Sequence, residues 1–142
     1  MASKKKPQGP VYDVIDEPER FVPQTQRNKD LPEDQRAAYD LMPYTHQELH
    51  RAMRRAQTIR DDHDKEHDEP MPEEEYEGIL EQELFAIQVR GIHNVNMRGA
   101  DGAVVAVEDP RVIWRARSPE LVVHVGMIRR RLLELGQTDP NS

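Results

Sequence analysis

The sequence contains no cysteine, which excludes disulfide bonds and thiolate chemistry. Aromatic residues make up only 5% of its 142 residues, and no apolar run approaches the length that spans a bilayer. The N-terminus, MASKKKPQGP, has no apolar stretch behind its lysines and is therefore not expected to act as a secretory signal. These absences predict a protein that is made in the cytoplasm and has no membrane partner.

Positive charge is also in short supply, because 27 Asp and Glu residues outnumber 20 Lys and Arg residues and give a net charge of −7. This balance argues against general affinity for nucleic acid or for an anionic membrane, although a local patch can differ. Serine occurs only at positions 3, 118 and 142, so a serine nucleophile with its partners is hard to assemble. No catalytic residue and no cofactor are therefore expected.

The large aliphatic residues are concentrated in the second half of the chain. Val, Ile and Leu number eight in residues 1–71 and twenty in residues 72–142. An independent core is expected only in the second half, and the first half has to stay flexible or pack on another surface. The predicted fold class is α+β: a small C-terminal helix–β-meander–helix unit, preceded by a helical pair and an extended, proline-rich N-terminal arm.

Residues 118–136 predict the best-defined helix. Ser118 is a good N-cap, and Pro119 suits the first helical position, where a missing N–H costs nothing. Gly136 is expected to end the helix in the left-handed conformation. The apolar residues follow at spacings of four and three on one face: Leu121, Val125, Ile128, Leu132 and Leu135. Such a face usually packs on its own domain; the alternative is that part of it meets another subunit.

A compact α+β domain is expected at residues 71–137, followed by a short tail at 138–142. Its first helix is predicted from Pro72 to about Arg90, with Gly91 as the stop. Clusters of β-branched residues predict two clear strands and one weaker strand, at 103–107, 111–116 and 92–97 respectively. A unit of roughly 65 residues is near the lower limit for a self-sufficient core, which favours stabilisation through assembly.

The arm is predicted at residues 1–29, where four prolines interrupt any regular helix. Spaced apolar residues on an extended segment are typical of peptides that add a strand to a sheet or dock in a groove. The alternative is a disordered tail with incidental hydrophobic residues. The candidate partner-binding residues are Val11, Tyr12, Val14, Ile15, Phe21 and Val22.

A helical pair with an acidic linker is expected at residues 30–70. The first helix is predicted at 30–42, where Asp30 and Glu33 have capping-box spacing, and the second opens at Thr45 with Glu48 as its reciprocal cap. The stripe of the second helix is made of small and unbranched residues, so it buries little area per turn. Nine of the fifteen residues from 61 to 75 are acidic, which indicates a charged linker or a fraying helix end.

Two histidine pairs have the spacing of metal ligands on a helix. His63, Glu66 and His67 match the H-x-x-E-H arrangement of inverted zinc peptidases. However, no apolar residue in this charged run can shield a metal, and no further ligand is evident. His46 and His50 share the same spacing and are better explained as solvent-facing residues. No metal site is therefore predicted, although incidental binding by His63 and His67 stays open.

Arginines of the C-terminal half are candidates for one basic patch: Arg115, Arg117, Arg129, Arg130 and Arg131. Nucleic acid would use such a patch, but the aromatic partners that stack on single-stranded bases are scarce. Nucleic-acid binding is therefore an unfavoured alternative that stays open.

The function expected from these features is that of a non-enzymatic structural or adaptor subunit, which binds other protein subunits of a larger complex through its arm and helical faces. The arm and small domain suit a phage virion component, such as a head–tail connector or minor capsid protein, by architectural analogy. The alternative is a small regulatory protein that docks on a bacterial enzyme or polymerase. A nucleic-acid-binding module is the third possibility.

Overall fold

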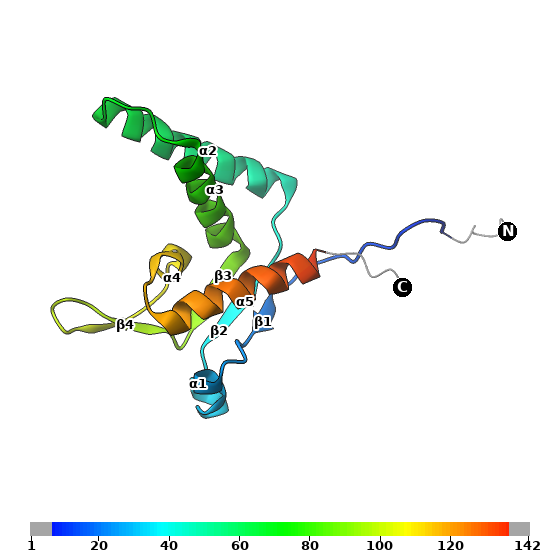
Figure 1. The fold of residues 1–142 in the computed structure, drawn as a ribbon. Helices are drawn as coiled ribbons and strands as arrows, with labels where there is room; N and C mark the ends of the chain where they lie inside the picture. The colour runs from blue at the N-terminus through cyan, green and yellow to red at the C-terminus, as the bar shows by residue number, and fades with distance from the viewer. Residues whose placement is uncertain (1–6, 137–142) are drawn as a thin grey trace.

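The computed structural model describes residues 7–136, which form helices and two small antiparallel sheets (Figure 1). The α+β class is confirmed. In chain order the elements are β1 (Glu19–Phe21), α1 (Gln26–Lys29), the 3-10 turn η1 (Glu33–Gln35), β2 (Ala38–Leu41), α2 (His46–Glu66), α3 (Glu73–Gln88), β3 (Val89–His93), β4 (Asn96–Arg98), β5 (Val104–Ala106), α4 (Pro110–Arg115) and α5 (Pro119–Leu135).

The main sheet takes one strand from each of three distant parts of the chain. Its order is β1-β2-β3, and both neighbours run antiparallel to the central strand β2. Tyr39 of β2 lies opposite Phe21 of β1 and Ile92 of β3. Strands β4 and β5 form a separate hairpin, whose turn contains Gly102 with φ of +83°.

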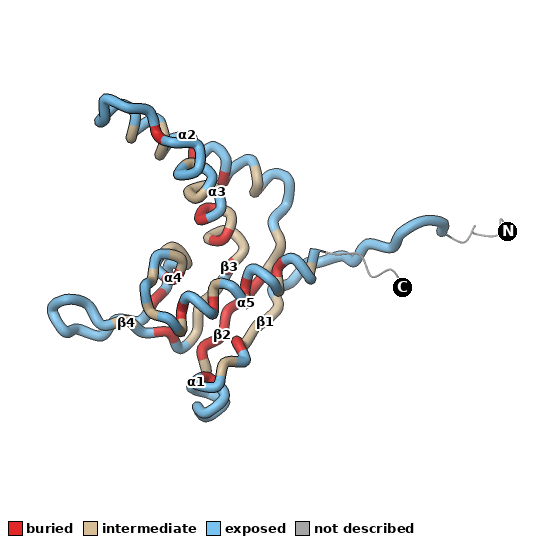
Figure 2. The backbone as a smooth tube through the Cα atoms, viewed as in Figure 1, coloured by how far each residue is buried: buried red, intermediate tan, exposed pale blue. Residues whose placement is uncertain are grey.

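The core lies between this sheet and α5. Tyr39, Leu41 and Ile128 are fully buried, and Figure 2 shows the buried positions gathered along β2 and the adjoining face of α5. Because side chains alternate across a strand, Arg20 and Asp40 point to the opposite face of the sheet. There Gly91 lies across from Asp40, and a Cβ on Gly91 would come within 2.5 Å of an Asp40 carboxylate oxygen.

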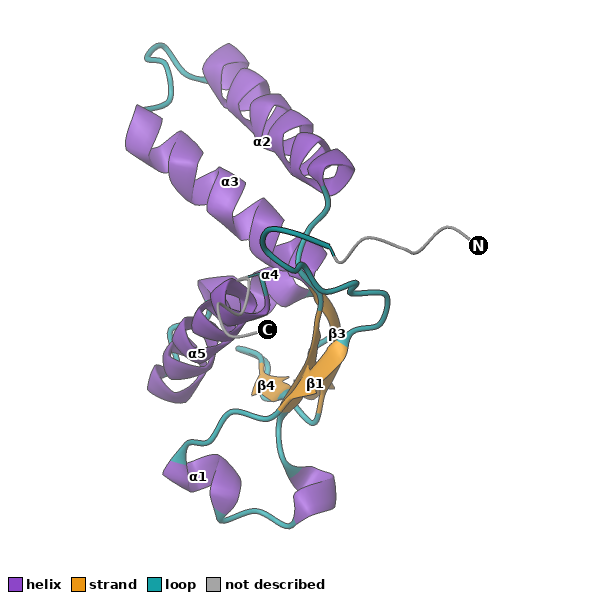
Figure 3. Cartoon of the chain, turned by 90° about the vertical axis from the view of Figure 1, so that its right-hand side faces the viewer, coloured by secondary structure: helices purple, strands orange, loops and turns teal. Residues whose placement is uncertain are grey.

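A helical hairpin of α2 and α3 projects from this body (Figures 1 and 3). The predicted capping box at Thr45 and Glu48 is confirmed. The buried residues of α2 are Ala52 and Ala56, both small, as expected for a stripe of small and unbranched residues. The acidic run begins inside this helix and continues into the connection to α3. Among residues 7–136, no helix is both long enough and apolar enough to cross a membrane.

An ion pair anchors α4 to the hairpin. Glu83 of α3 is 2% exposed, and the guanidinium Nε of Arg111 donates to its two carboxylate oxygens at 3.0 and 3.2 Å. Arg55 of α2 approaches the same carboxylate at 3.5 Å but is largely exposed. The hydrogen bonds to Glu83 raise the pKa of Arg111, so its guanidinium stays charged.

Two predicted elements are wrong because long-range pairing and capping outweigh local propensity. Residues 30–42 do not form one helix: the segment contains η1 and then β2, which gains two strand partners. Residues 111–116 were expected to be a strand, but Asp109 caps a helix there by accepting from the amide of Arg111, and Pro110 occupies its first position. The predicted meander is therefore wrong in its third strand, and the weaker strand at 92–97 is split between β3 and β4.

The three other predicted elements are confirmed as α3, β5 and α5, with two corrections at helix ends. Gly91 does not end α3, because that helix already stops at Gln88. Gly91 lies instead in β3. Gly136 caps α5 with φ of −82°, so it is not left-handed. The tail at 138–142 lies outside the described residues, and the division of the chain into separate domains stays a prediction.

Replacing Ile128 with Ala is expected to lower the free energy of unfolding by about 2–5 kcal/mol, because it opens a cavity at a fully buried site. Leu133 of the same helix is 69% exposed, so Leu133→Ala is expected to change stability by no more than about 0.5 kcal/mol. Urea unfolding of both variants checks the comparison. Equal losses would contradict the assignment of the buried face.

Replacing Arg111 with Ala is expected to destabilise the fold by about 3–5 kcal/mol, because it strips a buried carboxylate of its main partner. The matched change, Arg55→Ala, removes an exposed partner and is expected to cost about 0–1 kcal/mol. Thermal and urea unfolding measure both effects. A larger loss from Arg55→Ala would show that the hairpin contact, rather than α4, holds Glu83.

Candidate functional site

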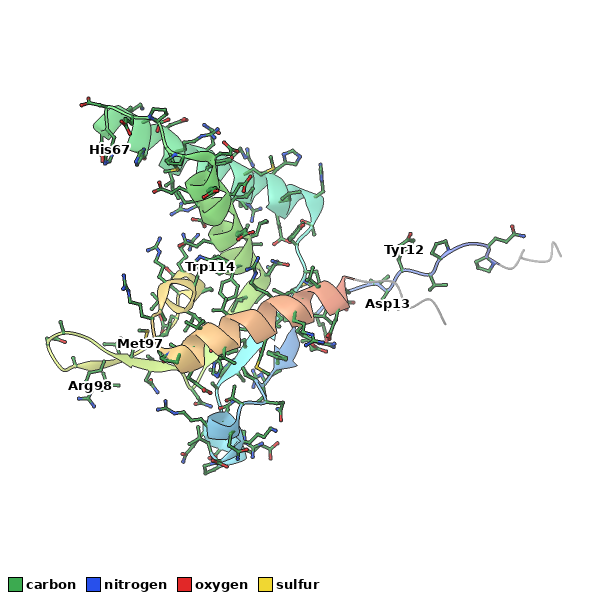
Figure 4. All side chains as sticks on the ribbon, in the orientation of Figure 1. Tyr12, Asp13, His67, Met97, Arg98 and Trp114 are labelled. Atoms are coloured by element: carbon green, nitrogen blue, oxygen red, sulfur yellow. The ribbon has the colours of Figure 1, made fainter. Side chains whose placement is uncertain are left out.

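The N-terminal arm, residues 7–18, is the most exposed apolar segment of the described chain. Val11, Tyr12 and Val14 are 48%, 74% and 88% exposed, and Ile15 is also exposed. No hydrogen bond joins residues 7–18 to the rest of the described chain, and Figure 4 shows Tyr12 and Asp13 on a segment that runs away from the body. Four of the six candidate partner-binding residues are therefore accessible.

The other two candidates belong to the fold. Phe21 lies in β1 and packs against the core, and Val22 is half-buried beside it. Sequence patterns missed this strand because it has only three residues and its partner, β2, was assigned to a helix. The accessible arm ends at about Pro18.

Glu19 anchors the arm at the point where it leaves the body. Arg131 of α5 donates to both oxygens of the Glu19 carboxylate, at 2.6 and 2.7 Å. These hydrogen bonds hold the pKa of Glu19 below its usual value. The bidentate geometry fixes the direction of the chain at one flank of α5.

An apolar groove of about 580 Å³ lies between α3, α5 and the segment that enters α2. Leu84, Leu132 and Leu133 contribute aliphatic walls, and Tyr44 is 43% exposed at its edge. Arg129 and Glu81 face each other at the rim, 3.6 Å apart. The groove can therefore accept an apolar segment that is flanked by charge.

The predicted basic patch is largely paired with acceptors of the same chain. Arg117 lies exposed in the connection between α4 and α5, and has no ion pair within the described range. The other four contact acceptors: Arg115 with Gln82, Arg129 with Glu81, Arg130 with Glu134, and Arg131 with Glu19 and Glu134. Local pairing lowers the positive potential that a nucleic acid would meet.

The predicted histidine pairs lie on the faces of α2. The His63 and His67 rings stack with centroids 4.1 Å apart, near the tip of the hairpin (Figure 4). His46 and His50 approach each other at 2.9 Å between their Nε2 atoms. Among residues 7–136, no group of three or more potential metal ligands is assembled. Neither pair has the ligands of a closed zinc site within this part of the chain.

A buried polar network connects β2 to α5. Tyr39 and His124 are 0% and 2% exposed, and the Tyr39 hydroxyl lies 2.8 Å from His124 Nδ1. His124 Nε2 lies 3.1 Å from Glu120, which also accepts from the Thr25 hydroxyl. A carboxylate can only accept, so Nε2 carries the proton, and Nδ1 accepts from Tyr39. Sequence reasoning missed the network, although His124 follows Leu121 and precedes Ile128 at core-facing spacings.

This network borders a second cavity, of about 400 Å³, which Arg27, Asn94 and Arg98 also line. Both ring nitrogens of His124 are already engaged, and burial lowers its pKa more than Glu120 raises it. Burial likewise raises the pKa of the Tyr39 hydroxyl. Neutral groups of this kind, with their hydrogen bonds made, stabilise a core.

The unfolding free energy is expected to fall as the pH drops below about 6.5, the usual pKa of histidine. Because the folded pKa of His124 is depressed, the unfolded chain binds the proton first, so the stabilising contribution is present above pH 6.5 and lost below it. Urea unfolding at about pH 7.5 and about pH 5.5 measures the change. A His124→Gln variant lacks this titration and is expected to show a smaller pH dependence; an unchanged difference would contradict the assignment.

No protein-family model, curated protein or solved structure matches this chain. The arm and the groove both expose apolar side chains, as do β5 and the outer side of α5.

Proposed function

We propose that the protein is a non-enzymatic structural or adaptor subunit of a larger protein assembly, and that it binds neighbouring subunits through its N-terminal arm and exposed helical faces. The observation that carries the proposal is the arm itself. It presents Val11, Tyr12, Val14 and Ile15 to solvent, and no hydrogen bond joins residues 7–18 to the rest of the described chain. Apolar anchors on an extended segment suit recognition by a groove or a sheet edge.

The energetics favour a complex that is held by more than one arm. Burial of each large apolar side chain contributes about 1.5–3 kcal/mol. Ordering the backbone costs about 1–2 kcal/mol per residue, which offsets most of that gain for a segment of this size. One arm therefore binds weakly, and several arms in one complex raise the overall affinity through effective concentration.

Further surfaces support the same function. The outer side of α5 exposes Val122 and Val123 at 55% and 48%, and the projecting hairpin of α2 and α3 offers a long polar surface. The pairing of four arginines favours protein partners over nucleic acid.

A phage virion component, such as a head–tail connector or minor capsid protein, is the more specific form of this proposal and rests on the arm-plus-domain architecture alone. A small regulator of a bacterial enzyme or polymerase is the alternative and would use the same arm. Stoichiometry separates them: many copies in a symmetric assembly favour the virion component, and a defined one-to-one complex favours the regulator.

Hydrogen exchange of the dilute full chain, read by mass spectrometry, tests the proposal. The amides of residues 11–15 are expected to exchange at nearly the unprotected rate, while those of β2 and α5 are protected. A triple variant, with Val11, Tyr12 and Val14 each replaced by Ser, is the control and is expected to keep its stability within about 0.5 kcal/mol. Strong protection of residues 11–15 in the dilute protein would mean that the arm packs on its own body, and would remove the main support for an adaptor.

A further inference from the structure

We infer that the groove between α3 and α5 is the docking site for the arm of a second copy of this chain, with residues 11–15 as the inserted segment. The inference rests on the proposed function in one respect, since both require that the arm binds protein. It goes further because it names the partner and the surface.

The groove and the arm match in shape and polarity. The groove has apolar walls from Leu84, Leu132 and Leu133, and the arm is an extended segment with apolar residues on both sides. Alternation along an extended chain places Tyr12 and Val14 on one side. These are the two most exposed apolar residues of the arm, so they are the natural pair to enter the groove.

The arm and the last turns of α5 also differ in the sign of their charge. Residues 7–18 contain three acids, Asp13, Asp16 and Glu17, and no lysine or arginine. The last turns of α5, residues 129–136, contain three arginines and one glutamate. Arg129 lies at the rim of the groove, and the Arg130 side chain is 86% exposed. Both arginines also contact an acid of their own chain, Glu81 and Glu134, at 3.6 and 3.7 Å. These pairs are exposed and therefore weak, and an acidic arm that enters beside them competes for the same guanidinium groups.

The positions of two arginines on α5 indicate which copy supplies the arm. Arg131 binds Glu19 where the arm leaves the body, and Arg129 lines the groove. Two positions on a helix are about 200° apart, so these arginines lie on opposite flanks of α5. The arm of the same chain starts on the opposite flank and runs away from the body (Figures 1 and 4). A second copy has no such constraint, and reciprocal exchange of arms gives a closed two-fold dimer.

Sedimentation velocity with complementary variants tests the inference. One variant disables the arm, with Tyr12→Ser and Val14→Ser; the other disables the groove, with Leu133→Glu, which repels an acidic arm and sits at a site that is 69% exposed. The wild-type chain is expected to dimerise with increasing concentration, and each variant alone to dimerise at least about tenfold more weakly. Mixing the two variants leaves one intact arm–groove contact and is expected to give a heterodimer that is weaker than the wild-type dimer but stronger than the homodimer of either variant.

Val104→Glu is the matched control, because Val104 is 58% exposed in β5 and does not line the groove. It is expected to leave dimerisation unchanged. Equal weakening by Val104→Glu and Leu133→Glu, or a mixture that associates no more strongly than either variant alone, would overturn the inference. A wild-type chain that stays monomeric would overturn it too, whether the arm is free or docks in its own groove.

The outcomes also separate this inference from the proposed function. If the chain is monomeric and residues 11–15 remain unprotected, the arm stays available for a different protein, so only the second-copy inference fails. If residues 11–15 are protected in the monomer, the arm packs on its own chain. In that case both the inference and the adaptor proposal fail.

Discussion

The fold depends on β2 being held between strands from two distant parts of the chain. β1 and β3 both hydrogen-bond to it, and its inward residues Tyr39 and Leu41 are fully buried. Without β2 the two edge strands have no partner in the main sheet, and α5 has no surface on which to bury Ile128. The N-terminal strand β1 and the C-terminal helix α5 are therefore expected to fold and unfold together.

This arrangement gives the two flanks of α5 different roles. On one flank, Arg131 grips Glu19, and the network through His124 ties the helix to β2. On the other flank, the helix meets α3 incompletely and leaves the groove that Arg129 borders. One flank thus directs the arm outward, and the other leaves an apolar surface uncovered. The combination is what a subunit needs if it completes its burial only by assembly.

The hairpin of α2 and α3 shows how a chain with little apolar surface can still build an ordered element. Alanines at positions 52 and 56 let the helices approach closely, but they bury little area. The ion pair of Glu83 with Arg111 supplies a second connection to the body through α4. This ion pair therefore supplies part of the stabilisation that a larger apolar core would otherwise provide.

The sequence by itself determined the helices with complete local signals: the capping box at Thr45 and Glu48 and the stripe through Ile128 suffice, because caps and periodicity act within a few residues. The sequence also predicted the exposed segment 11–15 but made the arm too long, because residues 19–29 were expected to belong to it and contain β1 and α1 instead. Only the tertiary structure decided that residues 38–41 form a strand, that α4 is a helix, and that His124 is bonded to Tyr39. Strand pairing and burial are long-range choices, so local propensity is overridden wherever a distant segment supplies the hydrogen bonds.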